Sequence, residues 1–270
     1  MEEFDAAIVG AGAAGLMCAI AAGRRGRRVV LIDHAPEAGR KILISGGGRC
    51  NFTNLEVAPD RFFSANPHFC RSALARYTQH DFLAMVEAHG IAWHEKTLGQ
   101  LFCDGSARQV VEMLARECAE AGVELRLDQR VAGVSRDDGF VVALEAGEVA
   151  APALVLATGG LSIPRMGATG LAHDVARGFG LAVTELRPAL VPLVFSDDDL
   201  GFMHALSGVS AEVVASCNGV AFRENLLFTH RGLSGPAILQ VSSCWREGEA
   251  IAIDLLPGED AAATLRARKR

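Results

Sequence analysis

Apolar runs of strand length alternate with a helical pattern at the start of this chain. The residues between Asp5 and Gly10 form a short apolar run, as a buried strand does, and residues 28–33 predict a second apolar strand that ends in an acid. The segment between them, residues 13–24, is rich in alanine and glycine, a composition that suits a helix packed closely on a sheet. The order of strand, helix and strand predicts a parallel sheet with helices against it, and therefore an α/β fold.

The pattern then becomes a mixture of helices and antiparallel strands. Residues 72–88 and 106–121 carry apolar side chains at helical spacing, and each segment predicts one helix. Residues 131–136 and 139–145 lie on either side of a strong turn signal that includes Asp137, and they predict a hairpin. A small antiparallel meander in this place is not typical of a simple dehydrogenase.

Two further segments complete the first part of the chain. Residues 153–157 are apolar and predict a buried strand that runs into Thr158-Gly159-Gly160. Residues 34–54 show no convincing periodic element, so we expect a loop there.

The pattern of apolar and polar residues changes near Pro188. Short strands follow, and Ser196-Asp-Asp-Asp199 predicts a polar loop between them. We place a domain boundary near residue 190, which divides the chain into residues 1–190 and 191–270.

Two helix starts are expected in the second part. Pro236 belongs in a first helical turn, and Ser234 is the expected cap. Another helix opens at about residue 261 and continues toward Arg270.

Composition indicates an ordinary globular protein. Half of the 270 residues are hydrophobic and 21% are charged. The net charge of −6 gives no general argument for binding nucleic acid. Seven cysteines without a C-x-x-C pair fit a reducing cytoplasm, and eight histidines without an H-x-x-x-H pair lead us to expect no metal site.

A membrane span is the rival interpretation of the first apolar segment. Residues 6–23 carry no charge, and a stretch of about 18 apolar residues nearly crosses a bilayer. However, three glycines within six positions disfavour a helix, and the preceding Met-Glu-Glu-Phe-Asp is acidic where a signal peptide is basic. We therefore expect no membrane association.

The glycines themselves predict a dinucleotide site. Gly10 permits a tight turn, Gly12 lets the backbone approach a pyrophosphate, and Gly15 lets the helix pack close to the strand. Phosphates are favoured at the helix start, where unpaired N–H groups meet the positive end of the macrodipole. Asp33 ends the next strand, 23 residues after Gly10, where a carboxylate accepts hydrogen bonds from ribose hydroxyls.

A second glycine-rich stretch follows. Arg40 and Lys41 precede Ser45-Gly-Gly-Gly-Arg-Cys-Asn51-Phe-Thr-Asn54. Three consecutive glycines expose backbone N–H groups, and such a loop can cradle phosphates or a flat heterocycle. A flexible surface loop is the alternative.

Together these motifs resemble one family. The opening glycines are similar to the FAD-binding start of many flavoproteins, and the G-G-G-R-C-N block resembles that of BaiN/RdsA-type NAD(P)/FAD-dependent oxidoreductases. The blocks Ala157–Gly160, Gly167–Gly170 and Phe228–Ala237 look like the same family, in the same order.

The resemblance implies an architecture. It is a Rossmann-like FAD-binding domain, with a parallel sheet and a small meander, interrupted after about residue 190 by a β-barrel domain. That barrel is itself interrupted by a helical insert, which we expect to start near 261–270. Family members then return to the FAD domain, whereas no second Gly-Glu or Gly-Asp flavin block follows Gly160 here. The chain therefore resembles a C-terminally truncated member.

The resemblance also implies FAD as cofactor and NAD(P)H as electron donor. By this resemblance, the glycine turn holds the pyrophosphate, Asp33 binds the adenosine ribose, and Val131 offers backbone contacts to the adenine. Arg40 and Lys41 neutralise charge on the phosphate or ribose side of the cofactor. The remaining expected contacts to the cofactor are Ala14, Ser45, Gly46, Gly47, Gly48, Asn51, Thr158 and Gly159.

The expected reaction is reduction of an activated C=C bond, which needs a hydride from the flavin and a proton from an acid. Cys50 is the first candidate acid, and Arg49 beside it is expected to lower its pKa. A packed, inert cysteine is the alternative. His230 is the second candidate.

The resemblance leaves two substrate classes open: uridine in ribosomal RNA, reduced to dihydrouridine, and a steroid-type enone. We expect RNA, which requires a basic surface, and the arginine-rich residues 24–28 and 266–270 are candidates. An enone requires a large apolar pocket.

Two hypotheses of other classes stay open. One is a flavin-binding protein without turnover. The other is an NAD-dependent dehydrogenase that uses the first motif alone, against which the Ser45–Asn54 loop argues.

Overall fold

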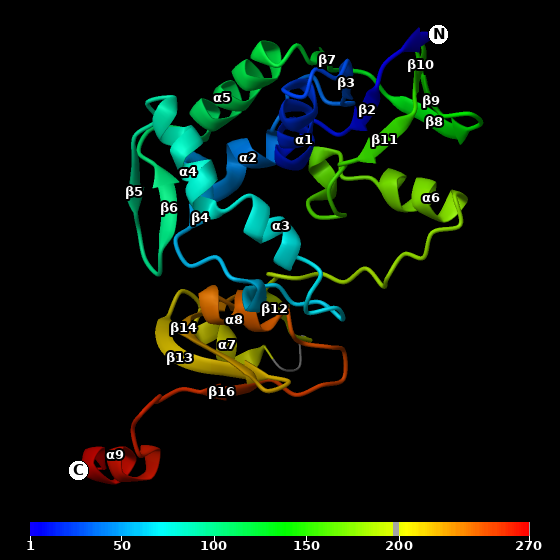
Figure 1. Ribbon diagram of the computed structural model, residues 1–270. Coiled ribbons are helices and arrows are strands. Elements are labelled where there is room, and N and C mark those ends of the chain that lie inside the picture. Colours follow the sequence, from blue (N-terminus) through cyan, green and yellow to red (C-terminus); the bar gives the residue numbers. More distant parts are fainter. Residues whose placement is uncertain (197–199, 270) are drawn as a thin grey trace. The chain divides into compact units, whose positions relative to one another are not determined.

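The computed structural model describes residues 1–196 and 200–269 (Figure 1). Residues 197–199 of the expected polar loop, and Arg270, lie outside the described residues. Contacts divide the chain into two units, residues 1–184 and 185–270. This division falls six residues before the boundary expected from the sequence.

A four-stranded parallel sheet forms the centre of the first unit (Figure 1), in the order β11-β2-β3-β7. All three of its strand pairs are parallel. The strands are β2 (Ala6–Val9), β3 (Val29–Ile32), β7 (Glu124–Arg126) and β11 (Ala153–Leu156). The α/β class and the apolar strands expected from the sequence are confirmed.

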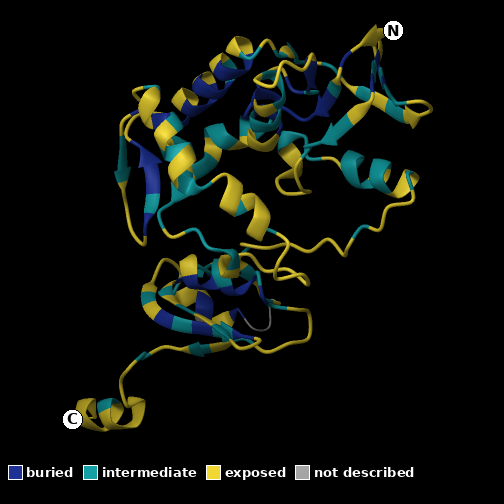
Figure 2. Ribbon diagram, in the orientation of Figure 1, coloured by how far each residue is buried: buried dark blue, intermediate teal, exposed yellow. Residues whose placement is uncertain are grey.

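The two faces of this sheet bury different layers, because successive side chains of a strand point to opposite faces. Ile8 and Leu31 pack among helical residues such as Leu16 and Leu114. The helices concerned are α1 (Ala13–Gly23) and α5 (Ala107–Glu120). Val30 and its neighbours on the other face pack against an antiparallel sheet. Buried residues therefore run through both faces of the central strands (Figure 2).

The antiparallel layer is the expected meander. Its order is β1-β10-β9-β8, and β1 joins it by a parallel pair. The strands are β1 (Glu2–Glu3), β8 (Val131–Arg136), β9 (Phe140–Leu144) and β10 (Gly147–Ala151). The hairpin expected across Asp137 is confirmed, with Arg136 paired to Phe140.

The first unit also contains a third, small sheet, with the strand order β4-β6-β5. It consists of β4 (Asn51–Asn54), β5 (Trp93–Glu95) and β6 (Gln100–Cys103). The other helical segments of the first unit are α2 (Arg40–Ile44), α3 (Arg71–Arg76), α4 (Gln79–Ala88) and α6 (Leu171–Gly178), with 3-10 turns at Ser45–Gly48, Pro59–Arg61 and Pro164–Met166.

The expected loop over residues 34–54 is wrong, because α2, a 3-10 turn and β4 occupy much of it. These elements are too short to show a period in the sequence. Gly39 starts α2 with a positive φ of 69°, and a side chain there would press on Val111 of α5. Close packing on α5 therefore fixes α2, and the spacing of apolar residues in the sequence does not reveal this packing.

The single helix expected over 72–88 is also wrong, because it is two helices, α3 and α4. Thr78 stands between them in extended conformation and caps α4. Its hydroxyl accepts a hydrogen bond from the Asp81 N–H, and the Asp81 carboxylate accepts one from the Thr78 N–H. This capping box starts a new helix where apolar spacing alone suggests continuity.

The second unit contains a five-stranded antiparallel sheet, in the order β12-β15-β14-β13-β16. Its strands are β12 (Leu193–Val194), β13 (Ser210–Cys217), β14 (Val220–Thr229), β15 (Gly232–Ser234) and β16 (Ala252–Asp254). Its helices are α7 (Gly201–Ala205), α8 (Pro236–Val241) and α9 (Ala261–Arg268). Closure of this sheet into a barrel stays a prediction, as does a helical insert from α9.

Pro236 begins α8 as expected, but Ser234 is not its cap. Ser234 ends β15, and Gly235 is the capping residue, with a φ of 91°. A side chain at Gly235 would press on the Asn225 carbonyl oxygen of β14. The close contact with β14 therefore requires a glycine at the capping position of α8, so the cap is Gly235 and not Ser234.

None of the helices within residues 1–196 and 200–269 has both the length and the apolar character needed to cross a membrane.

The two-faced central sheet generates a stability prediction. Leu31→Ala removes a fully buried side chain, so we expect the free energy of unfolding of the first unit to fall by about 2–5 kcal/mol. Leu181→Ala, at a residue that is 63% exposed, is the matched control and should change it by less than about 0.5 kcal/mol. Urea titration measures both; equal effects would contradict the assigned core.

Candidate functional site

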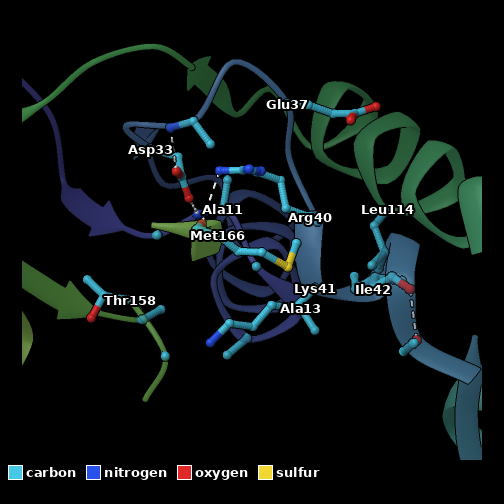
Figure 3. Close-up of a pocket in the computed structure, with 18 of the residues that line it drawn as sticks. Ala11, Ala13, Asp33, Glu37, Arg40, Lys41, Ile42, Leu114, Thr158 and Met166 are labelled. Atoms are coloured by element: carbon cyan, nitrogen blue, oxygen red, sulfur yellow. Dashed lines mark hydrogen bonds between the residues drawn. The ribbon is translucent and has the colours of Figure 1, made fainter. Parts of the chain in front are cut away.

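The first unit contains a cavity of about 430 Å³ where the glycine turn meets α2 and the segment after β11 (Figure 3). Its wall includes the carboxyl-end side of β2 and β3, represented by Gly10 and Asp33. Ligands of open α/β sheets bind at this end of the strands. The cavity is therefore where a dinucleotide would be expected on topology alone.

The three glycines of the first turn have different roles. Gly10 has a φ of 108°, and a side chain there would collide with the Ala157 carbonyl oxygen of the neighbouring strand. A side chain at Gly15 would collide with the Gly10 carbonyl oxygen. At Gly12 a side chain would meet no atom within 4 Å. Gly10 and Gly15 are thus needed for packing, whereas Gly12 leaves open space at the start of α1.

Asp33 fixes this turn. One carboxylate oxygen accepts a 2.6 Å hydrogen bond from the Ala11 N–H, and the other accepts a 2.8 Å bond from the Ala35 N–H (Figure 3). The first bond joins the end of β3 to the glycine turn after β2. Because a carboxylate has about four acceptor positions, Asp33 keeps capacity for ribose hydroxyls.

Two cations join α2 to the segment after β11. The Arg40 guanidinium donates to the Met166 carbonyl oxygen at 3.0 Å (Figure 3). The Lys41 ammonium donates to the Ser162 hydroxyl at 3.0 Å and to the Gly160 carbonyl oxygen at 3.3 Å. Both side chains line the cavity and place positive charge in its wall.

The triple glycine forms a left-handed turn. Gly46 and Gly47 have φ values of 57° and 66°, which few other residues adopt. A side chain at Gly46 would also press on the Phe102 ring. This turn brings Ser45 and Cys50 together, since the Cys50 N–H donates to the Ser45 carbonyl oxygen at 3.0 Å.

Cys50 lines the cavity and is only 5% exposed. Burial raises the pKa of its thiol above the usual range, and a hydrogen bond with Ser45 offsets part of that rise. The expectation that Arg49 lowers this pKa is wrong, because desolvation is the larger effect. At neutral pH the thiol is therefore protonated and can donate a hydrogen.

Two buried polar atoms in the cavity wall lack hydrogen-bond partners among the described residues. They are the Thr158 hydroxyl oxygen and His34 Nε2. A buried polar group without a partner costs free energy, so such atoms indicate that another molecule satisfies them. Both belong to the segments that a dinucleotide would contact.

The cavity brings together most of the site residues expected from the sequence. Those that line it are Gly10, Gly12, Ala14, Asp33, Arg40, Lys41, Ser45, Cys50, Asn51, Thr158 and Gly159.

Other expected residues have a different place. Gly15 packs beneath the turn, and the turn over residues 46–48 does not line this cavity. Val131 lines a smaller cavity of about 50 Å³, whose wall shares Asp33 and Thr158 with the first. His230 belongs to the second unit and is exposed.

Sequence reasoning missed several lining residues. His34 directly follows Asp33 and could have been found from that position. Gly167 opens a block that we connected only with the family, and Met166 directly precedes that block. Phe52 and Phe82 come from β4 and α4, and their rings lie 6.2 Å apart. Phe82 was missed because the sequence pattern did not predict that a new helix, α4, begins just before it.

No group of three or more histidine, cysteine, aspartate or glutamate side chains that could hold a metal ion occurs within residues 1–196 and 200–269.

Comparison with known families agrees with this geometry. The family model described as the HI0933-like protein Rossmann domain matches residues 4–230. The chain belongs to this HI0933-like Rossmann family. The Rossmann class expected from the glycine turn is therefore confirmed, and the turn, Asp33 and the triple glycine all lie within the matched range.

Relatives of this HI0933-like chain carry enzyme names. A protein of Escherichia coli named ribosomal RNA dihydrouridine synthase is 55% identical over 262 residues, which cover 96% of this chain and 66% of that protein. A protein of the same name from Haemophilus influenzae is 48% identical and is covered to 64% of its length, against 94% of this chain. A 3-dehydro-bile acid delta(4,6)-reductase of Clostridium scindens is 27% identical over 270 residues, which cover 94% of this chain and 65% of that protein. The chain thus spans slightly less than two thirds of these relatives.

The glycine geometry predicts two separable effects. Gly15→Ala should destabilise the first unit by several kcal/mol, because its methyl group meets a backbone oxygen that cannot move freely. Gly12→Ala should leave stability within about 1 kcal/mol of the original, yet weaken dinucleotide binding at least tenfold by filling the open space. Thermal unfolding and FAD titration measure these effects, and a stable Gly15→Ala variant would contradict the close approach.

The Cys50 environment predicts a pH dependence. Alkylation by iodoacetamide, followed at Cys50 by mass spectrometry, should reach half of its maximal rate at a higher pH than alkylation of a cysteine in a short unfolded peptide, because burial raises the pKa. Ser45→Ala should shift this midpoint upward, since it removes the hydrogen bond that lowers the pKa. Ser72→Ala, at an exposed serine of α3, is the control. A midpoint at or below that of the peptide cysteine would show that desolvation does not dominate the pKa of Cys50.

Proposed function

We propose that this chain is an FAD-dependent oxidoreductase that reduces an activated C=C bond, with uridine in ribosomal RNA as its substrate. One observation carries the proposal: the glycine turn after β2, Asp33, Ser45, Asn51 and Thr158 line one cavity. The two relatives named ribosomal RNA dihydrouridine synthase support the choice of substrate.

The cavity fits a flavin dinucleotide on three grounds. Gly12 leaves space for a pyrophosphate at the start of α1, where helix N–H groups lack acceptors. Asp33 has acceptor capacity for a ribose, and Arg40 and Lys41 supply positive charge. The unpartnered Thr158 hydroxyl would find its hydrogen-bond partner in the cofactor.

The residues named for the adenine and for the flavin ring are also proposals. Val131 would contact the adenine from the smaller cavity. The turn over Gly46, Gly47 and Gly48, which does not itself line the cavity, would hold Ser45 and Asn51 against the flavin ring, and Gly159 would close the other side of the ring.

FAD, when bound, supplies hydride transfer, and NAD(P)H is the proposed source of its electrons. The chain itself would supply the proton. Cys50 holds a hydrogen on Sγ at neutral pH, because its pKa is raised, and it lies in the cavity wall. Its proposed role is to donate that proton to the substrate carbon that does not receive the hydride.

A cytoplasmic location is part of the proposal. All seven cysteines are free, as is usual in a reducing compartment that also contains ribosomal RNA.

A small-molecule enone reductase is the second candidate. Phe52, Phe82, Met17 and Leu114 give the cavity an apolar side, as a steroid-type substrate requires. The bile acid reductase of Clostridium scindens supports this alternative, although at 27% identity. A flavin-binding chain without turnover is the third.

Product analysis distinguishes these candidates. The FAD-loaded chain is incubated with NADPH or NADH and large-subunit ribosomal RNA from cells that lack the corresponding enzyme. We expect nucleoside mass spectrometry to show uridine that has gained two hydrogen atoms, and Cys50→Ala to reduce the yield at least tenfold. Reduction of a steroid enone without RNA product would favour the second candidate, and flavin binding without either product the third.

Thr158 provides the test of cofactor binding. Thr158→Val keeps the shape of the side chain but removes its hydroxyl, so FAD affinity should fall about 5–10-fold. The free energy of unfolding without FAD should be unchanged or slightly higher, because the buried hydroxyl has no hydrogen-bond partner within residues 1–196 and 200–269. Thr97→Val, at an exposed position, is the control. Equal FAD affinity in both variants would remove Thr158 from the proposed site.

A further inference from the structure

A twenty-residue segment of the first unit, residues 61–80, is exposed and carries no acidic residue. Sixteen of its residues are exposed and none is buried. It contains three arginines and two histidines, although the whole chain has a net charge of −6. Figure 2 shows α3, within this segment, as mostly exposed. We name residues 61–80 the aromatic-basic segment.

Aromatic rings stand out among its exposed side chains. Phe69 is 79% exposed, Phe62 is 48% exposed and Tyr77 is 41% exposed. Large exposed rings grouped on one segment mark an interaction surface. Nucleic-acid bases stack on such rings without regard to sequence, because every base has a π-face.

The cations of the segment are available for an anionic partner. Arg71 and Arg76, at the two ends of α3, make no ion pair within the described part of the chain. Arg61 is partly neutralised by Asp60, with 3.8 Å between guanidinium nitrogen and carboxylate oxygen. Free guanidinium groups beside exposed rings are the combination that single-stranded RNA requires, with phosphates on the former and bases on the latter.

The segment lies in the connection between two elements that line the cavity. It follows β4, which contributes Phe52 to the cavity wall, and precedes Phe82 of α4, which lines the same wall. The Gln79 amide donates a 2.8 Å hydrogen bond to the Leu55 carbonyl oxygen, so the end of the segment is tied to the chain directly after β4. RNA bound along the segment would therefore be held by the connection between two walls of the cavity.

We propose that the aromatic-basic segment binds single-stranded RNA beside the cavity, with bases stacked on Phe69 and phosphates at Arg71 and Arg76. The inference rests on the proposed function. Chemistry on a base requires that base to leave its stack, and the flanking nucleotides then need a surface outside the reaction cavity. The aromatic-basic segment supplies that surface.

An anionic membrane is the other partner that aromatic and basic residues attract, but the geometry disfavours it. Membrane-surface helices present a continuous apolar face. The only large apolar residue of α3 is Leu74, which is half-buried, and Phe62 and Phe69 lie outside the helix. Dispersed rings of this kind suit separate bases better than a lipid surface.

The test is fluorescence anisotropy of a labelled, unstructured RNA 12-mer titrated with the full chain. Phe69→Ala should weaken binding at least about fivefold, while Phe69→Trp, which keeps a stacking ring, should retain the original affinity. Arg71→Gln with Arg76→Gln should reduce the slope of log affinity against log salt by about 1.4, since each phosphate contact on a single strand contributes about 0.7.

Arg116→Gln with Arg136→Gln is the matched control, because it removes the same charge from two exposed arginines outside both candidate RNA surfaces. Arg25→Gln with Arg27→Gln tests the competing cluster over residues 24–28. Both double variants should change affinity less than twofold, and circular dichroism should show that all variants are folded. A larger loss in the Arg25/Arg27 variant than in the Arg71/Arg76 variant would overturn the proposal and assign RNA binding to residues 24–28.

The remaining outcomes separate this inference from the proposed function. If the chain forms dihydrouridine and the Phe69 and arginine variants bind RNA normally, the segment is not the RNA surface, while the function stands. If the variants lose RNA binding but the chain forms no dihydrouridine, the surface stands and the function fails. Binding of the chain to anionic phosphatidylglycerol vesicles, lost in the same variants and without RNA binding, would overturn the inference in favour of a membrane.

Discussion

The hydrogen bond from the Ala11 N–H to the Asp33 carboxylate is the constraint on which the cavity depends. It joins the ends of two adjacent parallel strands, β2 and β3, and so fixes where the glycine turn lies relative to the end of the sheet. The turn fits there because Gly10 and Gly15 have no side chains to collide with backbone oxygens. The same carboxylate both shapes the cavity and offers acceptor positions to a ligand within it.

The other walls of the cavity are positioned by contacts from residues far apart in the sequence. Arg40 and Lys41 hold α2 to the segment after β11. The left-handed turn after α2 places Cys50 in a wall where its thiol is buried and protonated. A positively charged side with Arg40 and Lys41 and an apolar side with Phe52 and Phe82 thus arise from one set of packed elements. Under the proposed function, the charged side would hold phosphates and the apolar side would exclude water from the flavin ring.

The parts that could be predicted from the sequence are those with local signals. Apolar strands, the Asp137 hairpin and the glycine turn with Asp33 each carry their pattern within a few residues, and the structure contains them. The failures have a common physical cause. The short helix α2 is fixed by packing on α5, and Gly235 displaces Ser234 as a cap because β14 lies against it. Such tertiary contacts do not produce a periodic pattern in the sequence. The burial that raises the pKa of Cys50 and the open space at Gly12 also depend on tertiary structure and have no local sequence signal.

The central claim is that this cavity, as a unit, holds a flavin dinucleotide. Hydrogen–deuterium exchange of the chain with and without FAD, with NAD as the comparison ligand, tests it most directly. The account predicts that FAD, and not NAD, slows exchange of backbone amides in three separate segments, residues 10–16, 45–51 and 157–160. Protection confined to residues 10–16, or equal protection by NAD, would contradict the claim, because the triple glycine and Thr158 would then take no part in binding.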